Sequence, residues 1–300
     1  MSMIFKFGAA PEDVLQGSGH TLFVEGKNNQ AFDPVVMEEL LKNNGLQMTV
    51  KAIGHCDNVR STAQALISYQ PSYYFLIDRD DNDDLTVEKS WNSFQDLSQH
   101  NLLIWKKREL ENYFIEPTYL SNSSFLKENI SVDDLRDRIL AGCNQRIFID
   151  AANFTILDLN KKITKKLRCN FSDFSKFKCK EDGEQVLEQM TEMELKKNEI
   201  DEILTVDFVK QIYFETIQKL SGGTLPLQYG CGNWLEQLSG KEIMNSIMNQ
   251  CFQVKDRNDK YLQGADKTKQ VVRELLHLPL HQQPADFKNL VTLLHRRIRT

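Results

Sequence analysis

The chain has 300 residues, of which 41% are hydrophobic and 26% are charged, as in soluble globular proteins. Its formal net charge is −5, and it has no apolar run long enough to span a bilayer. A membrane protein and a strongly basic nucleic-acid binder are therefore not expected. The N-terminus, MSMIFKFGAAPEDV, lacks the basic and apolar regions of a secretory signal, which favours a cytoplasmic location.

The charge is unevenly distributed. Residues 1–120 carry 10 Lys and Arg against 17 Asp and Glu, whereas residues 121–300 carry 27 against 25. Any polyanionic ligand must therefore be held by a local basic segment, by a cation or by a partner protein. The six cysteines form no C-x-x-C pair and are interpreted as structural thiols. No phosphate-binding P-loop motif occurs.

The first 120 residues alternate between strand and helix patterns. Apolar runs predict strands at 21–26, 48–54, 73–78 and 102–105. Helix-length segments separate them, with Asp33 and Asp57 as the expected caps of the first two helices and a third helix near 85–97. This alternation predicts an α/β fold with a mostly parallel sheet flanked by helices.

The pattern changes after Pro117. Ser131 and Asp134 form a capping box at the start of a helix, and RIFIDAAN (146–153) is interpreted as one more strand. Helical patterns then follow at 181–204, 206–220, 240–252, 265–277 and 285–298. We therefore expect an α/β catalytic domain in residues 1–120 and a mainly helical domain, contacting substrate or partner, in residues 121–300.

Acidic residues follow two of the predicted strands. Glu25 comes after the first strand, and Asp78 and Asp80 come at the end of the third. The carboxyl ends of parallel strands meet at one edge of a sheet, where converging carboxylates require a cation such as Mg²⁺. An EF-hand fails because its sixth and twelfth positions would be Asp83 and Lys89. A solvated acidic turn and an Asp-x-Asp phosphatase remain as alternatives, although phosphatases of that type usually continue with Gly-Thr.

At these residues the chain resembles the Toprim domain of topoisomerases, primases, maturation ribonucleases and OLD-type nucleases. That pattern has a glutamate after the first strand and Asp-x-Asp after the third. The Glu-Gly-Lys context at Glu25 and the stretch WKKRELENYFIEP (105–117) are similar to the OLD-type branch, and SGKEIMNSI (239–247) is similar more loosely. The resemblance is specific over residues 20–117.

The length, the helical second half and the missing ATPase motif resemble the nuclease effector subunits of the PARIS phage-defence systems. This resemblance implies a toxic endonuclease that cleaves tRNA and is controlled by a separate ABC-type ATPase. It also implies a homodimer in the active state. An OLD-type DNA-nicking enzyme and a non-catalytic Toprim module that only binds a partner are the alternatives.

The resemblance also implies roles for individual residues. Asp78 and Asp80 would ligate Mg²⁺, or Mn²⁺ as an alternative, and Glu25 would complete the ligand set or act as a general base. Glu111 is the expected additional ligand and Glu109 its fallback, since only one of them faces the site if the segment is extended.

Two cations accompany these acids in the sequence. Lys27 is expected to contact the scissile phosphate or to tune Glu25, with a solvated lysine as the alternative. Arg108 is expected to clamp a phosphate of the substrate, with a structural salt bridge as the alternative.

Segment 161–180 is the most basic part of the chain. It holds eight Lys and Arg and one acid, with three phenylalanines interleaved. Cations beside aromatic rings suit looped RNA, and Lys165, Lys166 and Arg168 are the expected substrate-binding residues. The three-residue spacing of the phenylalanines equally suits a helix packed into the core.

Overall fold

A computed structural model of the chain describes residues 19–94, 100–163, 185 and 191–299. The chain forms two compact units, one of residues 1–146 with 233–300 and one of residues 147–232. The last 68 residues thus group with the first 146, whereas the sequence placed them with residues 121–232. Among the described residues, no helix has the length and apolar content needed to cross a membrane.

The first unit is built on a four-stranded sheet in which all strands are parallel. The strands are β1 (Thr21–Val24), β2 (Thr49–Ala52), β3 (Tyr73–Ile77) and β4 (Leu102–Ile104), in the order β2-β1-β3-β4. The helices between them are α2 (Phe32–Asn43), α3 (Cys56–Leu66) and α4 (Asp84–Ser93). The predicted α/β class and parallel sheet are confirmed. All four strands lie where the sequence placed them, each ending one or two residues earlier.

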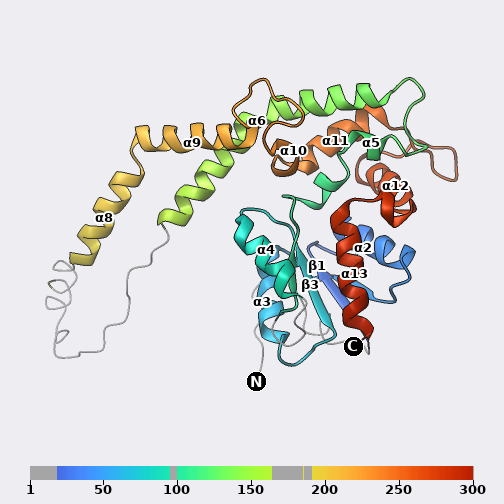
Figure 1. The fold of residues 1–300 in the computed structure, drawn as a ribbon, viewed down its shortest axis with the longest axis horizontal. Coiled ribbons are helices and arrows are strands. Elements are labelled where there is room, and N and C mark those ends of the chain that lie inside the picture. The colour runs from blue at the N-terminus through green and yellow to red at the C-terminus, as the bar shows by residue number, and fades with distance from the viewer. Residues whose placement is uncertain (1–18, 95–99, 164–184, 186–190, 300) are drawn as a thin grey trace. The chain divides into compact units, whose positions relative to one another are not determined.

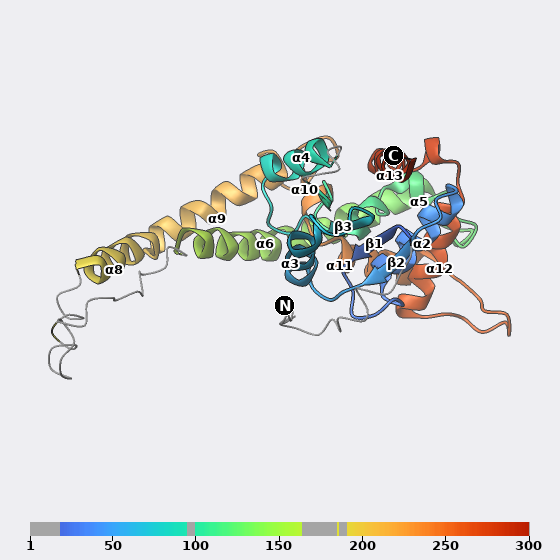
Figure 2. The same ribbon diagram turned by 90° about the horizontal axis from the view of Figure 1, so that it is seen from below.

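The strand order places a topological switch point between β1 and β3. The chain moves from β1 to one side to form β2, and then to the other side for β3 and β4. Right-handed crossovers therefore place α2 on one face and α3 with α4 on the other, as Figures 1 and 2 show. Ligands of open α/β sheets bind beyond the strand ends at such a point.

Apolar burial explains the central strands. All residues of β1 and β3 are buried, whereas the edge strand β2 is partly exposed. Phe23 stacks on Phe75 across the β1–β3 pair at a centroid distance of 5.0 Å. A continuous buried run is typical of a central parallel strand covered on both faces.

The chain after β4 packs back onto the sheet. It forms η1 (Leu110–Tyr113), α5 (Pro117–Leu120) and the start of α6 (Val132–Ile163). Residues 233–300 add α10 (Trp234–Gln237), α11 (Gly240–Cys251), α12 (Gly264–Leu276), η3 (Leu280–Gln282) and α13 (Ala285–Arg299). Phe287 of α13 lies 5.6 Å from the Trp105 ring and 5.2 Å from the Tyr113 ring. This aromatic packing joins the C-terminal helix to the segment after β4.

The second unit contains the rest of α6 with α8 (Thr191–Ile203) and α9 (Val206–Ser221). Thr205 caps α9 by accepting a hydrogen bond from the backbone N–H of Phe208, and Gly222 ends it in a left-handed conformation. The Tyr213 hydroxyl donates to the carbonyl of Phe148 on α6. The predicted helices at 206–220, 240–252, 265–277 and 285–298 are confirmed to within one residue at each end.

The strand predicted at 146–153 is wrong, because these residues lie inside α6. The local alternation of IFID is typical of a strand, but the longer pattern has a four-residue period. Fully buried residues recur at that spacing along the helix: Leu135, Ile139, Cys143, Ile147 and Ala151. A helix buries such a stripe on one face.

The helix starts confirm one predicted cap and correct two. Ser131 and Asp134 form the expected capping box, with the Asp134 carboxylate accepting from Ser131 and the Ser131 hydroxyl accepting from Asp134 N–H. The residue before α2 is Ala31 rather than Asp33, and the residue before α3 is His55 rather than Asp57. Both aspartates instead lie in the first turn of their helix.

Candidate metal centre

Glu25 and Asp78 meet at the carboxyl ends of β1 and β3. The register pairs Phe23 with Phe75, so the residues that follow the two strands come to the same edge. There the backbone N–H of Asp78 donates to Glu25 Oε1 at 2.9 Å. The predicted meeting of the first and third strand ends is therefore present in the structure.

Asp80 completes the three-residue constellation. Its backbone has a positive φ of 47°, an uncommon conformation that an aspartate tolerates better than most residues. Its N–H donates to the carbonyl of Arg108 at 3.2 Å. One carboxylate oxygen of Asp80, one of Glu25 and the sulfur of Cys56 all lie within 4.8 Å of one another.

The segment after β4 brings Glu111 to the same edge. Asp78 Oδ1 accepts from the backbone N–H of Leu110 at 3.0 Å, and Glu111 is the next residue in η1. The Glu111 side chain is buried, with 4% of the residue exposed. Its Oε2 has no hydrogen-bond partner among the described residues. A buried acceptor left in this way is costly unless a ligand completes it.

Glu109, the fallback ligand, has a structural role. Its carboxylate accepts from the backbone N–H of Lys241 at 2.8 Å and from the Ser239 hydroxyl at 3.3 Å. It also caps η1 together with Asn112. The expected extended segment is thus a helical turn, and this turn sends Glu109 toward α11 and Glu111 toward the strand ends.

Asp33 is a fifth acid at this edge that sequence reasoning missed. It lies in the first turn of α2, and the nearby carboxylates of Glu111 and Glu25, after burial itself, raise its pKa well above the ordinary value. Its place in the first turn after the strand that carries Glu25 was the available signal, but it had been interpreted as a cap. We call Glu25, Asp33, Asp78, Asp80 and Glu111 the carboxylate cluster.

The carboxylate cluster is strained by its own charge. Burial, and then repulsion by neighbouring carboxylates, raises the pKa of Asp78 well above its usual range. Burial raises the pKa of Glu25 to about 6 and that of Glu111 to about 7. The pKa of Asp80 is raised by partial desolvation and by Glu109. Proteins use such perturbed, mutually repelling acids at functional sites more often than in inert surfaces.

Lys241 is a cation that faces the carboxylate cluster, in addition to Arg60, whose charge lowers the pKa of Glu25. Lys241 lies in the first turn of α11, and its Nζ is 3.9 Å from Glu111 Oε1. Its charge lowers the pKa of both Glu25 and Glu111, although burial outweighs it. Lys241 belongs to the segment 239–247 that the sequence linked only loosely to nucleases, and long-range packing was needed to place it here.

Lys27 and Arg108, the two cations named from the sequence, differ in their contacts. Lys27 is exposed in the loop after β1. Arg108 donates through its guanidinium to the carbonyl of Gln237 and through its backbone N–H to that of Glu236. It therefore ties the segment after β4 to α10, while its charge lowers the pKa of Asp80. Lys165, Lys166 and Arg168 lie outside the described residues.

Gly26 and Gly54 hold the ends of β1 and β2 together beside the carboxylate cluster. Each donates its N–H to the other's carbonyl, at 2.9 and 3.0 Å. Gly26 has φ 143°, and a Cβ there would lie 2.9 Å from the Cβ of Ala31. Glycine is required for this turn.

Asn112 fixes η1 against α10 and is expected to be a major contributor to stability. It is fully buried; its Nδ2 donates to the carbonyls of Leu235 and Leu238, and its Oδ1 accepts from Glu109 N–H. We expect Asn112→Ala to lower the free energy of unfolding by about 3 kcal/mol, since three backbone groups lose their partner. Urea unfolding measures this loss. Asn122→Ala, at a more exposed amide, should cost under about 1 kcal/mol; equal losses in the two variants would contradict the assignment.

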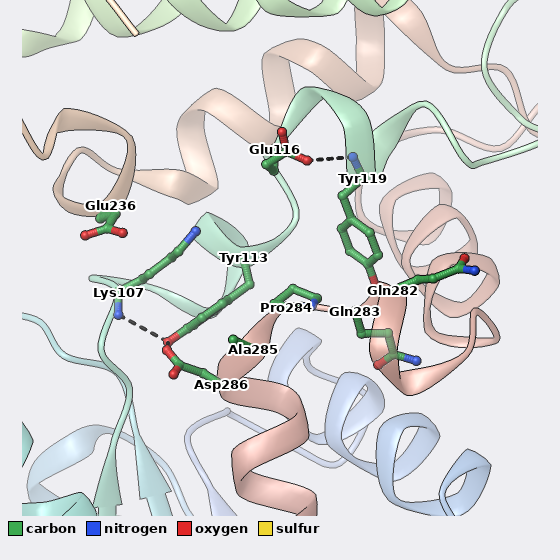
Figure 3. Close-up of a pocket in the computed structure, with 10 residues that line it drawn as sticks. All are labelled: Lys107, Tyr113, Glu116, Tyr119, Glu236, Gln282, Gln283, Pro284, Ala285 and Asp286. Carbon is green, nitrogen blue, oxygen red and sulfur yellow. Dashed lines mark hydrogen bonds between the residues drawn. The ribbon is translucent and has the colours of Figure 1, made fainter. Parts of the chain in front are cut away.

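A separate cavity of about 380 Å³ is lined by Tyr113 of η1 and by residues of the segments around α5 and η3. Figure 3 shows Tyr113 and Lys107 at one side and Tyr119 at the other. The Tyr113 hydroxyl donates to Asp286 at 2.7 Å and accepts from Lys107 N–H at 3.3 Å. No member of the carboxylate cluster lines this cavity, so we assign it no part in the metal centre.

The carboxylate cluster fits a hard divalent cation. Its donors are carboxylate oxygens, which Mg²⁺ and Mn²⁺ prefer, and one of them, Glu111 Oε2, is buried with no partner among the described residues. Of the four acids named from the sequence as its ligands, Glu25 and Asp80 have carboxylate oxygens within 4.8 Å of each other. Asp78 Oδ1 accepts from the backbone N–H of Leu110, and Glu111 and Asp33 act on Asp78 electrostatically.

Comparison of the chain with family models, with curated proteins and with solved structures gives no match. The resemblance to Toprim nucleases thus remains a prediction from the sequence.

Proposed function

We propose that this chain is a divalent-metal-dependent endonuclease of the Toprim type that hydrolyses phosphodiester bonds, with tRNA as its substrate. The observation that carries the proposal lies at one sheet edge, where Glu25 and Asp80 bring carboxylate oxygens within 4.8 Å of each other and Asp78 N–H donates to Glu25. Glu111, which raises the pKa of Asp78, has a buried carboxylate oxygen with no partner among the described residues. Acids gathered at a switch point are expensive to maintain in a fold unless they bind a cation.

In this proposal the bound cation supplies charge stabilisation at the phosphate and a more acidic water. The protein orients the acids around it. Asp78 is fixed by Leu110 N–H, and its own N–H fixes Glu25. Glu111, whose pKa burial raises to about 7 without a cation, would bind the cation in its ionised form. Lys241 is placed to neutralise a phosphate oxygen that approaches the acids.

Cation removal provides the test of the proposal. We expect purified protein with Mg²⁺ or Mn²⁺ to cut total tRNA into defined fragments, and EDTA to abolish this, because the carboxylates alone repel a polyanion. Sequencing of fragment ends identifies the bond that is cut. Nicking of plasmid DNA with intact tRNA would favour the DNA-nicking alternative. Absence of cleavage with either cation on either substrate would contradict the proposal.

By the same resemblance, we propose that an ABC-type ATPase partner restrains the nuclease until it is triggered. In cells, the chain alone should then inhibit growth and co-expression of its cognate ATPase should relieve the inhibition. A chain that leaves growth unaffected when expressed alone would contradict this regulation.

Lys241 is expected to matter more for cleavage than Lys27. Lys241→Gln removes the ammonium near Glu111, so Mn²⁺ should bind several-fold more tightly while cleavage slows by about 10²-fold, the scale of losing one charge-stabilising donor. Lys27→Gln, at the exposed lysine named from the sequence, is the matched comparison. Calorimetric Mn²⁺ titration and initial cleavage rates measure both effects; a larger rate loss in Lys27→Gln would reverse the assignment.

A further inference from the structure

Asp80 sits in a turn that hydrogen bonds between Arg79 and Asn82 hold closed. Its backbone has a positive φ of 47°, a conformation that persists in a residue other than glycine only where the surrounding structure holds it. The Asn82 N–H and Nδ2 both donate to the Arg79 carbonyl, at 2.9 and 2.6 Å, and Arg79 Nε donates to the Asn82 carbonyl at 3.1 Å. Asn82 therefore fixes the turn that carries Asp80.

Arg60 of α3 completes the hold on Asn82. It is half-buried, and its Nη2 donates to Asn82 Oδ1 at 2.8 Å. Because a guanidinium can only donate and a backbone carbonyl can only accept, the Asn82 amide is fixed at both ends. Its oxygen faces Arg60, and its nitrogen faces the Arg79 carbonyl. The bond thus ties α3 to the turn that follows β3.

We propose that Arg60 and Asn82 are positioning residues, which hold the turn of Asp80 so that its carboxylate stays beside that of Glu25. The two carboxylates have oxygens within 4.8 Å of each other. This inference deepens the proposed function and rests on it, because a cation held between the strand ends needs both acids in place at once. Arg60 and Asn82 act through Asp80 and are assigned no contact with the cation or the substrate.

The expected consequence is a weaker affinity for the cation when this hold is lost. Asp80 then spends part of its time in commoner backbone conformations, which carry its carboxylate away from Glu25. The apparent dissociation constant rises in inverse proportion to the fraction of molecules that are ready to bind. Loss of a residue that supports a metal ligand lowers affinity by about 10- to 100-fold. We expect the lower end, since the Asp80 N–H still donates to the Arg108 carbonyl.

Lys241 provides the matched control, because its charge also acts on Glu25. Burial raises the pKa of Glu25, and the charges of both Lys241 and Arg60 lower it, so each cation opposes the binding of another cation nearby. Removal of either charge therefore strengthens cation binding on electrostatic grounds. Lys241 pairs with Glu111, whereas Arg60 holds the turn. The two substitutions are therefore expected to change the affinity in opposite directions.

Calorimetric Mn²⁺ titration with no substrate present tests the proposal. The full chain is compared with Arg60→Gln, whose amide ends short of Asn82, with Asn82→Ala, with the double variant and with Lys241→Gln. We expect Asn82→Ala to bind Mn²⁺ about 10-fold more weakly and Arg60→Gln several-fold more weakly, whereas Lys241→Gln binds it more tightly. In the Asn82→Ala background, Arg60→Gln should instead tighten binding, since only the effect of its charge remains.

Tighter Mn²⁺ binding by Arg60→Gln than by the wild type would overturn the inference, as would an equal weakening by Arg60→Gln with and without Asn82. Amide hydrogen exchange over residues 79–84 without cation is the second readout. It should be faster in Arg60→Gln and Asn82→Ala than in the wild type, and unchanged exchange in both would also overturn the inference. Circular dichroism shows whether each variant is folded; if Arg60→Gln or Asn82→Ala is not, the other is compared with Lys241→Gln.

Failure of the proposed function is recognised separately. A wild type that binds no Mn²⁺ would contradict the metal-dependent nuclease and this inference together. A wild type that binds Mn²⁺, with Arg60→Gln and Lys241→Gln changing the affinity in the same direction, would contradict only the positioning role.

Discussion

A Glu25→Gln protein is expected to be catalytically inactive and yet more stable than the wild type when no cation is bound. Glutamine retains the oxygen that accepts from Asp78 N–H, so the strand ends stay joined. It removes one negative charge from a partly buried group of acids whose pKa values are already raised by burial and mutual repulsion. We expect a gain in the free energy of unfolding on the order of 1 kcal/mol at pH 8 in EDTA. Cleavage should fall by about 10³-fold or more.

Glu38→Gln is the matched control for this experiment. Glu38 lies on the exposed side of α2, so the same charge change there should leave both stability and cleavage nearly unaffected. Chemical unfolding in EDTA and cleavage rates with Mg²⁺ measure the two effects. A Glu25→Gln protein that is less stable without cation, or that cleaves at the wild-type rate, would show that Glu25 serves the fold rather than the reaction.

The sheet and its acidic edge could be predicted because their signals are local. The buried strands β1 and β3 are continuous apolar runs, and each is followed directly by a carboxylate at Glu25 or Asp78. The parallel arrangement follows from the spacing of the runs, and parallel strands bring their ends together. The strand pattern therefore named three of the five acids in the carboxylate cluster, Glu25, Asp78 and Asp80, whereas Glu111 was named through the resemblance.

The remaining parts of the site could not be found locally. Lys241 reaches Glu111 only because α11 packs on η1, a contact between residues 130 positions apart in the sequence. Cys56 and Asp33 sit in first helical turns whose direction depends on where each helix begins, and helix starts are the least certain boundaries in a sequence. A cysteine without a partner motif also gives no signal of its own.

The same limit explains the error at 146–153. A short apolar run is compatible with either a strand or a buried helix, and only its length and surroundings decide between them. The four-residue spacing of buried residues from Leu135 to Ala151 extends well beyond the short apolar segment. The segment therefore forms part of a long helix.

The stability of the metal-free protein is expected to fall as the pH rises from about 4.5 to 8. Burial raises the folded-state pKa of Glu25 to about 6 and of Glu111 to about 7, from an ordinary glutamate value of 4.5. Between these values the folded protein binds more protons than the unfolded chain, so unfolding becomes easier with increasing pH. The stabilisation is complete below about pH 4.5, the ordinary glutamate pKa, and is lost as the pH rises through each folded-state pKa.

For Glu111 the loss should be about 3 kcal/mol, at about 1.4 kcal/mol for each unit of pKa. Comparing wild type with Glu111→Gln in EDTA at pH 5 and pH 8 isolates this residue, because the other titrating groups are common to both proteins. The wild type should lose stability relative to the variant at pH 8, and a divalent cation should restore it there far more than at pH 5, since cation binding requires the ionised carboxylates. The contradicting result would be a wild type that gains stability over Glu111→Gln between pH 5 and pH 8 in EDTA. It would mean that groups within the fold already stabilise the ionised Glu111 carboxylate. The case for a cation at this edge would then lose its main support.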